Sequence, residues 1–171
     1  MRNYDYILFP APILLMENTR LTGKDWLDSQ GVAYRVMPVS SQTPMSEMSN
    51  VLGCTPTQLV VCDFYIGKRA PVIVVHSLSS RVNLELLCKH VGDSIERLGT
   101  NEECMKETGL SLMELHPFLE NYWWKVLDEK LFQQEKVYIR AGNMNEVLEI
   151  EANALKYVIG VVNGLLAEVT Q

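Results

Sequence analysis

Few residues in this sequence have types and spacings suited to chemistry. His116 precedes Pro117 in a segment with loop character, so it is the best placed of the three histidines for proton transfer near neutral pH. The sequence has no glycine-rich phosphate loop, no Gly-x-Ser-x-Gly turn and no His-Glu-x-x-His motif. The best-known nucleotide-binding, serine hydrolase and metalloprotease sites are therefore excluded, and His116 is left as a weak acid–base candidate.

The four cysteines do not have the spacing of a metal or redox site. They stand at positions 54, 62, 88 and 104, with no Cys-x-x-Cys pair and no histidine clustered with them. Cys62 falls within an expected strand and Cys88 on the apolar face of an expected helix, which is typical of small core residues. We expect no metal, no cofactor, and a reducing, cytoplasmic compartment.

Two further groups of residues could contact nucleic acid. Lys68 and Arg69 at an expected hairpin tip could bind phosphate, but a basic tip also keeps a sheet edge soluble. Trp123 and Trp124 could stack on a base, although such a pair more often closes a core or an interface. The chain has 15 Lys and Arg against 21 Asp and Glu, a net charge of −6. Any contact with nucleic acid must therefore be small and local, because extended binding relies on neutralising phosphates.

The length of 171 residues, with 47% hydrophobic residues, indicates one globular domain. The apolar stretch over 4–16 is interrupted by Asp5, Pro10 and Pro12 and is too short to span a bilayer. We expect an N-terminal arm over 1–18, which docks on the domain or provides a site for a protein partner or self-association. A single domain over 19–171 follows it.

The elements that must position any site alternate between helices and hairpins. Thr100 and Glu103 form a capping box, and glycines at 31, 53, 92 and 109 fit helix ends. The patterns predict helices over 19–30, 44–52, 84–91 and 100–108 and a last helix whose apolar face runs from Leu155 to Val169. They predict strands over 33–39, 58–66, 70–75, 136–140 and 147–151. This order favours an α+β fold with a mixed or antiparallel sheet.

Six pieces of the chain, in this order, carry a family resemblance. They read GVAYRVMPV, SEMSNVLGCTPTQLV, VNLELLCKHVG, ETGLSLMELHPF, VLDEKL and VYIRAGNMNEVLEIEANAL. Together they resemble the YbaK family, also called the prolyl-tRNA-synthetase-associated or ProX editing domain, over about three-quarters of the chain. No single piece is specific, and the ordered set carries the resemblance.

The resemblance implies a YbaK-like α+β fold: a mixed, largely antiparallel sheet or open barrel with surrounding helices. It also implies a domain related to those that hydrolyse amino acids from wrongly charged tRNA, with the acceptor end of tRNA as partner. In such a reaction water attacks an ester carbonyl, and donors must stabilise the oxyanion that forms. By the same resemblance, the residues that shape the pocket are Gly109, Pro117, Ala141 and Gly142.

The departures from the family pattern fall on the pocket. Val61 stands at the position of the family lysine, Met113-Glu114 at a Gly-Gly loop, and Arg140 at the serine of a Ser-Ala-Gly turn. Val147 stands at the position of an acidic residue that some members have. His116 and Arg140 remain as candidate polar groups of the pocket. We therefore predict an aminoacyl-tRNA editing domain with an eroded catalytic site. The alternatives are a non-catalytic module that binds a tRNA end, a nucleotide or a protein, and a purely structural subunit. An open cleft lined by Arg140 and His116 would favour the deacylase, and a filled one would exclude it.

Overall fold

The computed structural model describes residues 22–119, 124–162 and 164–171. The helices are α1 (Gly23–Ser29), α2 (Met45–Leu52), α3 (Leu84–Val91), α4 (Asn101–Thr108) and α5 (Ala152–Val161), with a short 3₁₀ helix, η1 (Glu129–Gln133). The strands are β1 (Arg35–Pro38), β2 (Val60–Gly67), β3 (Pro71–Ser77), β4 (Ile95–Leu98), β5 (Trp124–Asp128), β6 (Lys136–Ile139), β7 (Glu146–Glu151) and β8 (Leu165–Ala167).

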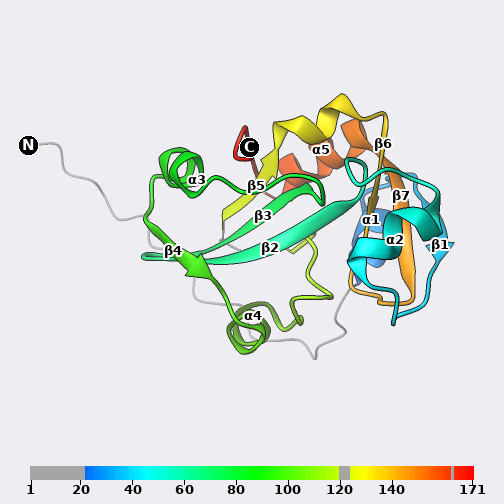
Figure 1. Cartoon of the computed structure of the whole chain (residues 1–171), viewed down its shortest axis with the longest axis horizontal. Helices are drawn as coiled ribbons and strands as arrows, with labels where there is room; N and C mark the ends of the chain where they lie inside the picture. The colour runs from blue at the N-terminus through cyan, green and yellow to red at the C-terminus, as the bar shows by residue number, and fades with distance from the viewer. Residues whose placement is uncertain (1–21, 120–123, 163) are drawn as a thin grey trace, which may run out of the picture.

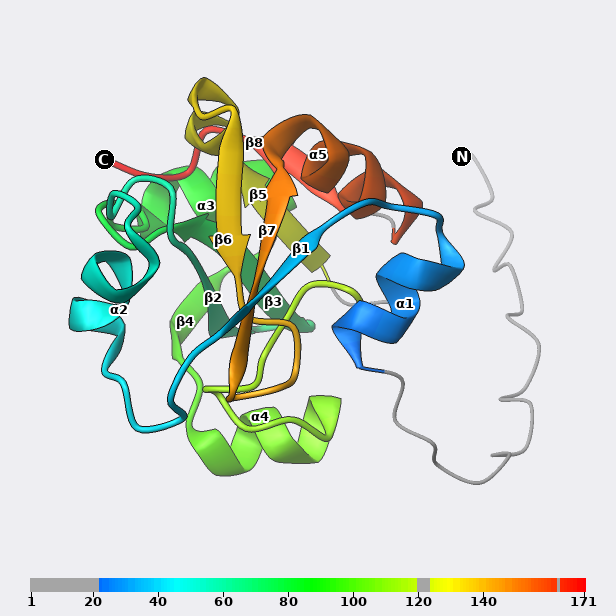
Figure 2. The same cartoon turned by 90° about the vertical axis from the view of Figure 1, so that its right-hand side faces the viewer.

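The strands form two sheets, which confirms the predicted α+β class. A five-stranded sheet has the order β4-β2-β3-β5-β8, antiparallel from β4 to β3 and parallel from β3 to β8. A three-stranded antiparallel sheet has the order β1-β7-β6. Figure 1 shows the smaller sheet at one end of β2 and β3, and Figure 2 shows it face on, with α1 and α2 on either side. A bridge between Leu59 and Tyr138 joins the two sheets.

The main core lies between the two sheets. Phe64 and Ile73 of the larger sheet are buried in one cluster with Val137 and Leu148 of the smaller sheet. The opposite face of the larger sheet is covered by α3, whose Leu87 packs in a second cluster. In Figure 1, α3 and α4 lie on opposite sides of the β2–β3 ribbon. Burial on both faces fixes β2 firmly, and β2 carries much of the candidate site.

Local signals placed most helix ends correctly. The Thr100–Glu103 capping box forms at the start of α4, and Gly53, Gly92 and Gly109 end α2, α3 and α4 in the left-handed conformation. The predicted start of the second helix at 44 is one residue too early. Pro44 has extended backbone angles and is itself the N-cap, with no side-chain hydrogen bond, so the helix begins at Met45.

The last predicted helix is too long. The α5 helix ends at Val161, and Leu165–Ala167 instead forms β8, parallel to β5. Gly164 permits the change of direction, since a side chain there would collide with Ile159. The apolar pattern continued past the turn because β8 is also buried, so periodicity alone did not mark the end of the helix. The predicted start of α1 at 19 and the whole arm over 1–18 lie outside the described residues.

Within the described segments, no helix has both the length and the apolar character that a membrane crossing requires.

Candidate functional site

A pocket of about 220 Å³ lies along an open part of the β2 edge. The β2 strand pairs with β3 along its length, but it pairs with β4 only from Tyr65 to Gly67. The edge at 60–63 is therefore left for other groups, which come from α2, the 112–115 loop and the end of β6. The lining residues are Met45, Val60, Val61, Cys62, Asp63, Leu112, Met113, Leu115, Ile139 and Arg140.

Backbone groups of β2 face this pocket. The carbonyl of Leu59 accepts a hydrogen bond from Leu78 on the β3 side, whereas the carbonyl of Phe64 accepts one from Gly99 on the other side. Because backbone groups alternate along a strand, the N–H and C=O of Cys62 point to the open edge. The pocket thus offers backbone donors and acceptors beside its largely apolar side chains.

Arg140 is the cationic side chain of the pocket. It follows β6 and is 7% exposed, and its Nε and Nη2 atoms have no hydrogen-bond partner among the described residues. Burial lowers the pKa of Arg140, but a guanidinium keeps its charge in proteins. Leaving a buried donor unsatisfied costs about 1–3 kcal/mol, and more for a charged group. Such an arrangement marks a place where a ligand oxygen would be stabilised.

Asp63 is the anionic side chain of the pocket. Its Oδ2 atom lies 2.8 Å from Nε2 of His76, a buried residue of β3. The Nδ1 atom of the same ring lies 2.9 Å from the carbonyl oxygen of Ser77 and 3.2 Å from Oγ of Ser80. The carboxylate is therefore held from behind by a fixed imidazole, while its side chain stays 35% exposed.

Cys62 also lines the pocket, but it is not poised as a nucleophile. Burial, with a smaller effect of the neighbouring Asp63 carboxylate, raises the pKa of the Cys62 thiol. The thiolate is the reactive form of cysteine, so this residue contributes shape and not covalent chemistry. Among the residues that the structure describes, no group of three or more His, Cys, Asp or Glu could hold a metal ion.

His116 is not one of the residues that line the pocket. It is 1% exposed, and its Nδ1 atom accepts a hydrogen bond from the N–H of Phe118 at 3.2 Å. Desolvation lowers the pKa of His116 from its usual 6.5 to about 4, so the ring is neutral at pH 7. A side chain at Gly142 would lie 3.4 Å from this ring. The structure thus places His116 behind the turn that follows Arg140.

The four glycine, proline and alanine positions lie in the loops around this turn. Gly109 and Gly142 have φ angles of 73° and 94°, which favour glycine. Pro117 is buried, and the carbonyl of Ala141 accepts a hydrogen bond from Gly23 at 2.8 Å. These residues connect α1, the 109–118 loop and the end of β6. None of them lines the pocket, and their role in shaping it stays a prediction.

Three of the positions that depart from the family pattern meet at the pocket, whereas Glu114 and Val147 do not line it. Val61 and Arg140 line it, and Met113 stands at its mouth with 57% of its surface exposed. An open pocket therefore lies beside Val61 and Arg140, but His116, Pro117 and Gly142 do not form its walls, so the predicted cleft lined by both Arg140 and His116 is found only in part. Sequence reasoning missed Asp63, and one signal could have found it, since it is the only charged residue in the apolar run from 59 to 66.

Comparisons with known proteins agree on the class of this protein. The profile of the aminoacyl-tRNA editing domain family matches residues 40–157, which is more than half of the chain. The chain belongs to the aminoacyl-tRNA editing domain family, as the YbaK/ProX resemblance predicted.

Solved structures share the fold at low sequence identity. The hypothetical protein APE2540 superposes with a TM-score of 0.76 at 23% identity, covering 86% of this chain and 98% of its own. A proposed trans-editing enzyme for prolyl-tRNA synthetase superposes with a TM-score of 0.73 at 19% identity, covering 86% and 94%. A search of curated proteins found no significant match. At these identities the structural likeness establishes the fold alone.

Proposed function

We propose that this protein binds the aminoacylated acceptor end of a tRNA and hydrolyses its ester, with the aminoacyl group in the Arg140 pocket. The observation that carries the proposal is the buried Arg140 guanidinium, whose Nε and Nη2 atoms have no partner in the described chain. When water attacks an ester carbonyl, the oxygen gains negative charge, and fixed donors in a site that excludes water stabilise it strongly. Arg140 supplies such donors.

The size and lining of the pocket fit one part of such a ligand. Sites for drug-sized molecules usually enclose roughly 300–1,000 Å³, whereas this pocket encloses about 220 Å³. An aminoacyl group is a better match than a whole aminoacyl-adenosine. The apolar walls, including Met45, Leu112 and Ile139, favour a small apolar side chain, and the β2 edge offers hydrogen bonds to the α-ammonium and carbonyl groups of the aminoacyl ester. The rest of the tRNA end would lie outside, near Met113.

We also propose that the catalytic machinery is reduced relative to the family pattern. Val61 cannot supply the charge of a lysine, and Arg140 approaches the pocket from β6 instead of β2. A planar guanidinium does not replace a lysine at another position without rearrangement of the ligand. We therefore expect hydrolysis above the spontaneous rate but with few protein groups taking part.

A second candidate function is a binding module without hydrolysis. Its supporting observation is the pair of bulky apolar residues, Val61 and Met113, at positions where the family pattern has a lysine and a glycine. In this case Arg140 would bind a phosphate or a carbonyl oxygen of a tRNA end or nucleotide, and no ester bond would break.

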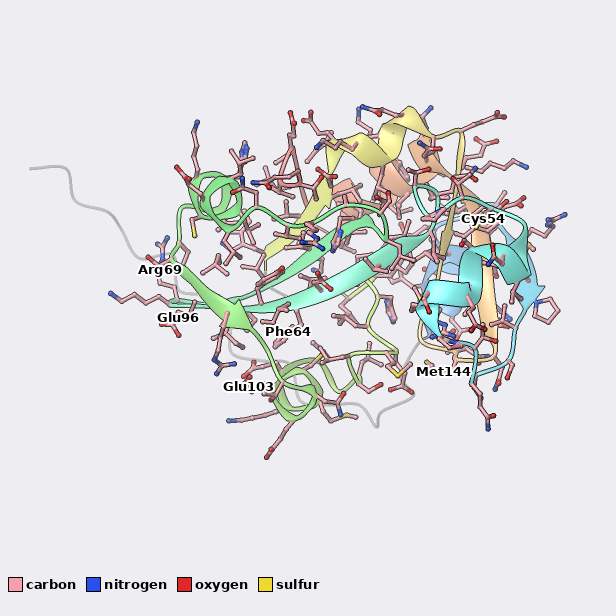
Figure 3. All side chains as sticks on the ribbon, in the orientation of Figure 1. Cys54, Phe64, Arg69, Glu96, Glu103 and Met144 are labelled. Carbon is pink, nitrogen blue, oxygen red and sulfur yellow. The ribbon has the colours of Figure 1, made fainter. Side chains whose placement is uncertain are left out.

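Single-turnover deacylation separates the two functions. The protein, in excess, would be mixed with a panel of mischarged tRNAs that includes tRNA for proline carrying alanine or cysteine. We expect hydrolysis above the spontaneous rate, reduced roughly 10²–10³-fold in Arg140→Gln, since one oxyanion donor is worth that much. The matched control is Arg97→Gln, which removes a cation that is ion-paired with Glu103. Glu103 lies at the β4 end of the molecule, opposite Met144 and Cys54 (Figure 3).

Wild-type protein that leaves every ester of the panel intact would contradict the deacylase. Retained affinity for the same aminoacyl-tRNAs, lost in Arg140→Gln, would then establish the binding module.

A further inference from the structure

Asp63 is the second charged side chain of the pocket, and hydrolysis of an ester needs a group that moves protons. We propose that the Asp63 carboxylate is the acid–base group of this site and that His76 is the residue that positions it. The inference rests on the proposed ester hydrolysis. It is independent of the Arg140 argument, because Arg140 acts on the carbonyl oxygen and Asp63 acts on the attacking water.

The pairing of β2 with β3 fixes the two residues. Val61 lies opposite His76 and Asp63 lies opposite Val74, so Asp63 and His76 are diagonal neighbours on one face of the sheet. The imidazole is buried, and it holds one oxygen of the carboxylate at 2.8 Å. This contact restricts the rotation of the Asp63 side chain, which lines the pocket.

The hydrogen bonds around His76 also determine where its protons lie. Ser80 Oγ donates to the carbonyl of Ser77 at 3.0 Å, and the same carbonyl lies 2.9 Å from Nδ1. A carbonyl oxygen only accepts, so Nδ1 carries a proton and donates it. Nε2 then faces the Oδ2 atom of the carboxylate at 2.8 Å. The remaining oxygen, Oδ1, receives no hydrogen bond from the described residues, which leaves it open to a water molecule in the pocket.

The step can be written with every atom placed. Oδ1 of Asp63 accepts a proton from the water while the water oxygen forms a bond to the ester carbonyl carbon. The carbonyl electron pair moves to its oxygen, opposite the donors of Arg140. When the bond from carbon to the ribose oxygen breaks, Asp63 returns the proton to that oxygen. The products are a free amino acid and an unesterified tRNA, and His76 keeps its proton throughout.

Variants of Asp63 test this role with the protein in excess over mischarged tRNA. A positioned acid–base group contributes about 10²–10⁴-fold, so Asp63→Asn should lower the single-turnover rate constant by that factor. The protein concentration at half-saturation should not change, because the amide keeps the shape of the side chain. Asp63→Glu should recover part of the rate. Glu102→Gln, on the exposed face of α4, makes the same change in charge and should leave both quantities unchanged.

His76 is tested by a double-mutant cycle. His76→Gln should lower the rate constant by about 10- to 100-fold through misplacement of the carboxylate, and the double variant should be no slower than Asp63→Asn alone. A merely structural role would instead lower the melting temperature and add to the effect of Asp63→Asn. If His76→Gln does not fold, the partly exposed Asp63→Asn still decides the acid–base role.

The outcomes separate the two proposals. If the wild type hydrolyses the ester and Asp63→Asn is fully active, the role of Asp63 is overturned and the proposed function stands. The same conclusion follows if Asp63→Asn changes only the protein concentration at half-saturation. Absence of wild-type hydrolysis on every tRNA of the panel overturns both. A rate constant that is lower in Asp63→Asn and His76→Gln, but not in Glu102→Gln, supports the proposal.

Discussion

A groove on the three-stranded sheet is larger than the Arg140 pocket, but the smaller pocket is the one with an unpaired buried cation. The groove encloses about 540 Å³ between the end of α1, β1, β7 and α5, more than twice the space of the pocket. Arg35, Lys136 and Glu149 of the groove are already paired with one another, whereas the guanidinium of the pocket is not. We therefore assign the site by its unsatisfied buried group and not by the volume of the hollow, and this assignment stays a proposal.

Glu149 is the centre of the pairing in the groove. Arg35 lies 3.2 Å from one of its carboxylate oxygens and Lys136 lies 3.2 Å from the other, and the hydroxyl of Tyr138 donates to it at 3.0 Å. A ligand entering the groove would have to compete with these contacts. A ligand entering the pocket would instead complete the contacts of Arg140.

The largest expected difference between the two regions is in how much stability each loses as the pH falls. Behind the pocket, burial lowers the pKa of His116 to about 4. In the groove, burial raises the pKa of Glu149, but hydrogen bonds from Tyr138 and Lys136 outweigh it and the pKa is lowered below 4.5. Both folded-state pKa values lie below the unfolded ones, so both groups stabilise the protein at neutral pH and lose that contribution as the pH falls.

The contribution of His116 begins to be lost near pH 6.5, whereas that of Glu149 is lost only below its usual pKa of 4.5. Unfolded His116 takes up a proton near pH 6.5 and the folded residue only near pH 4, so stability should fall by ~1.4 kcal/mol per pH unit, about 3 kcal/mol in all, across that window. His116→Asn keeps an acceptor for the N–H of Phe118 and cannot titrate, so its unfolding free energy should change less from pH 6.5 to 4. Denaturant unfolding at a series of pH values checks this, with His90→Asn on the exposed part of α3 as the control. Equal slopes in wild type and His116→Asn would contradict the neutral, buried state.

A smaller contrast concerns stability at neutral pH. Arg140→Met removes a buried charge whose donors are unsatisfied and fills the same space, so it should raise the free energy of unfolding by about 1–3 kcal/mol while hydrolysis is lost. Glu149→Gln leaves Arg35 and Lys136 without their anion and should lower the free energy of unfolding by about 1 kcal/mol, with hydrolysis intact. Urea unfolding with the deacylation assay measures both changes. If Arg140→Met lowers the free energy of unfolding, Arg140 has a structural partner. The charge in the pocket would then be paired, like the charges in the groove.

Much of the fold could be predicted because its signals are local. The capping box of Thr100 and Glu103, the glycines that end α2, α3 and α4, and the Gly67–Arg69 turn each depend on a few neighbouring residues. The patterns did not predict β4, β5 or β8, because these short strands are defined only by their pairing with β2, β3 and β5. Trp124, expected in a core or an interface, is not a core residue, since it is substantially exposed at the start of β5, and its place in an interface stays a prediction.

The candidate site could be predicted only in part, for the same reason. Arg140 was identified by its position in a family pattern, but its lack of partners depends on groups from three distant segments. The contact of Asp63 with His76 depends on the register of β2 and β3. His116 has the sequence surroundings of an accessible loop histidine. The packing of Phe118 on Trp26 and of His116 on Phe118 turns its ring inward, which no local pattern specifies.

The central claim is that the Arg140 guanidinium is the group that meets the aminoacyl ester. The most direct measurement follows the Nε–H signals of arginine side chains by nuclear magnetic resonance during titration with a non-hydrolysable 3′-aminoacylamino-adenosine. The account predicts that the signal assigned through Arg140→Lys shifts and becomes protected from solvent exchange, while that of Arg35 in the groove does not move. A saturable shift at Arg35 with an unchanged Arg140 signal would contradict it and place the ligand in the groove.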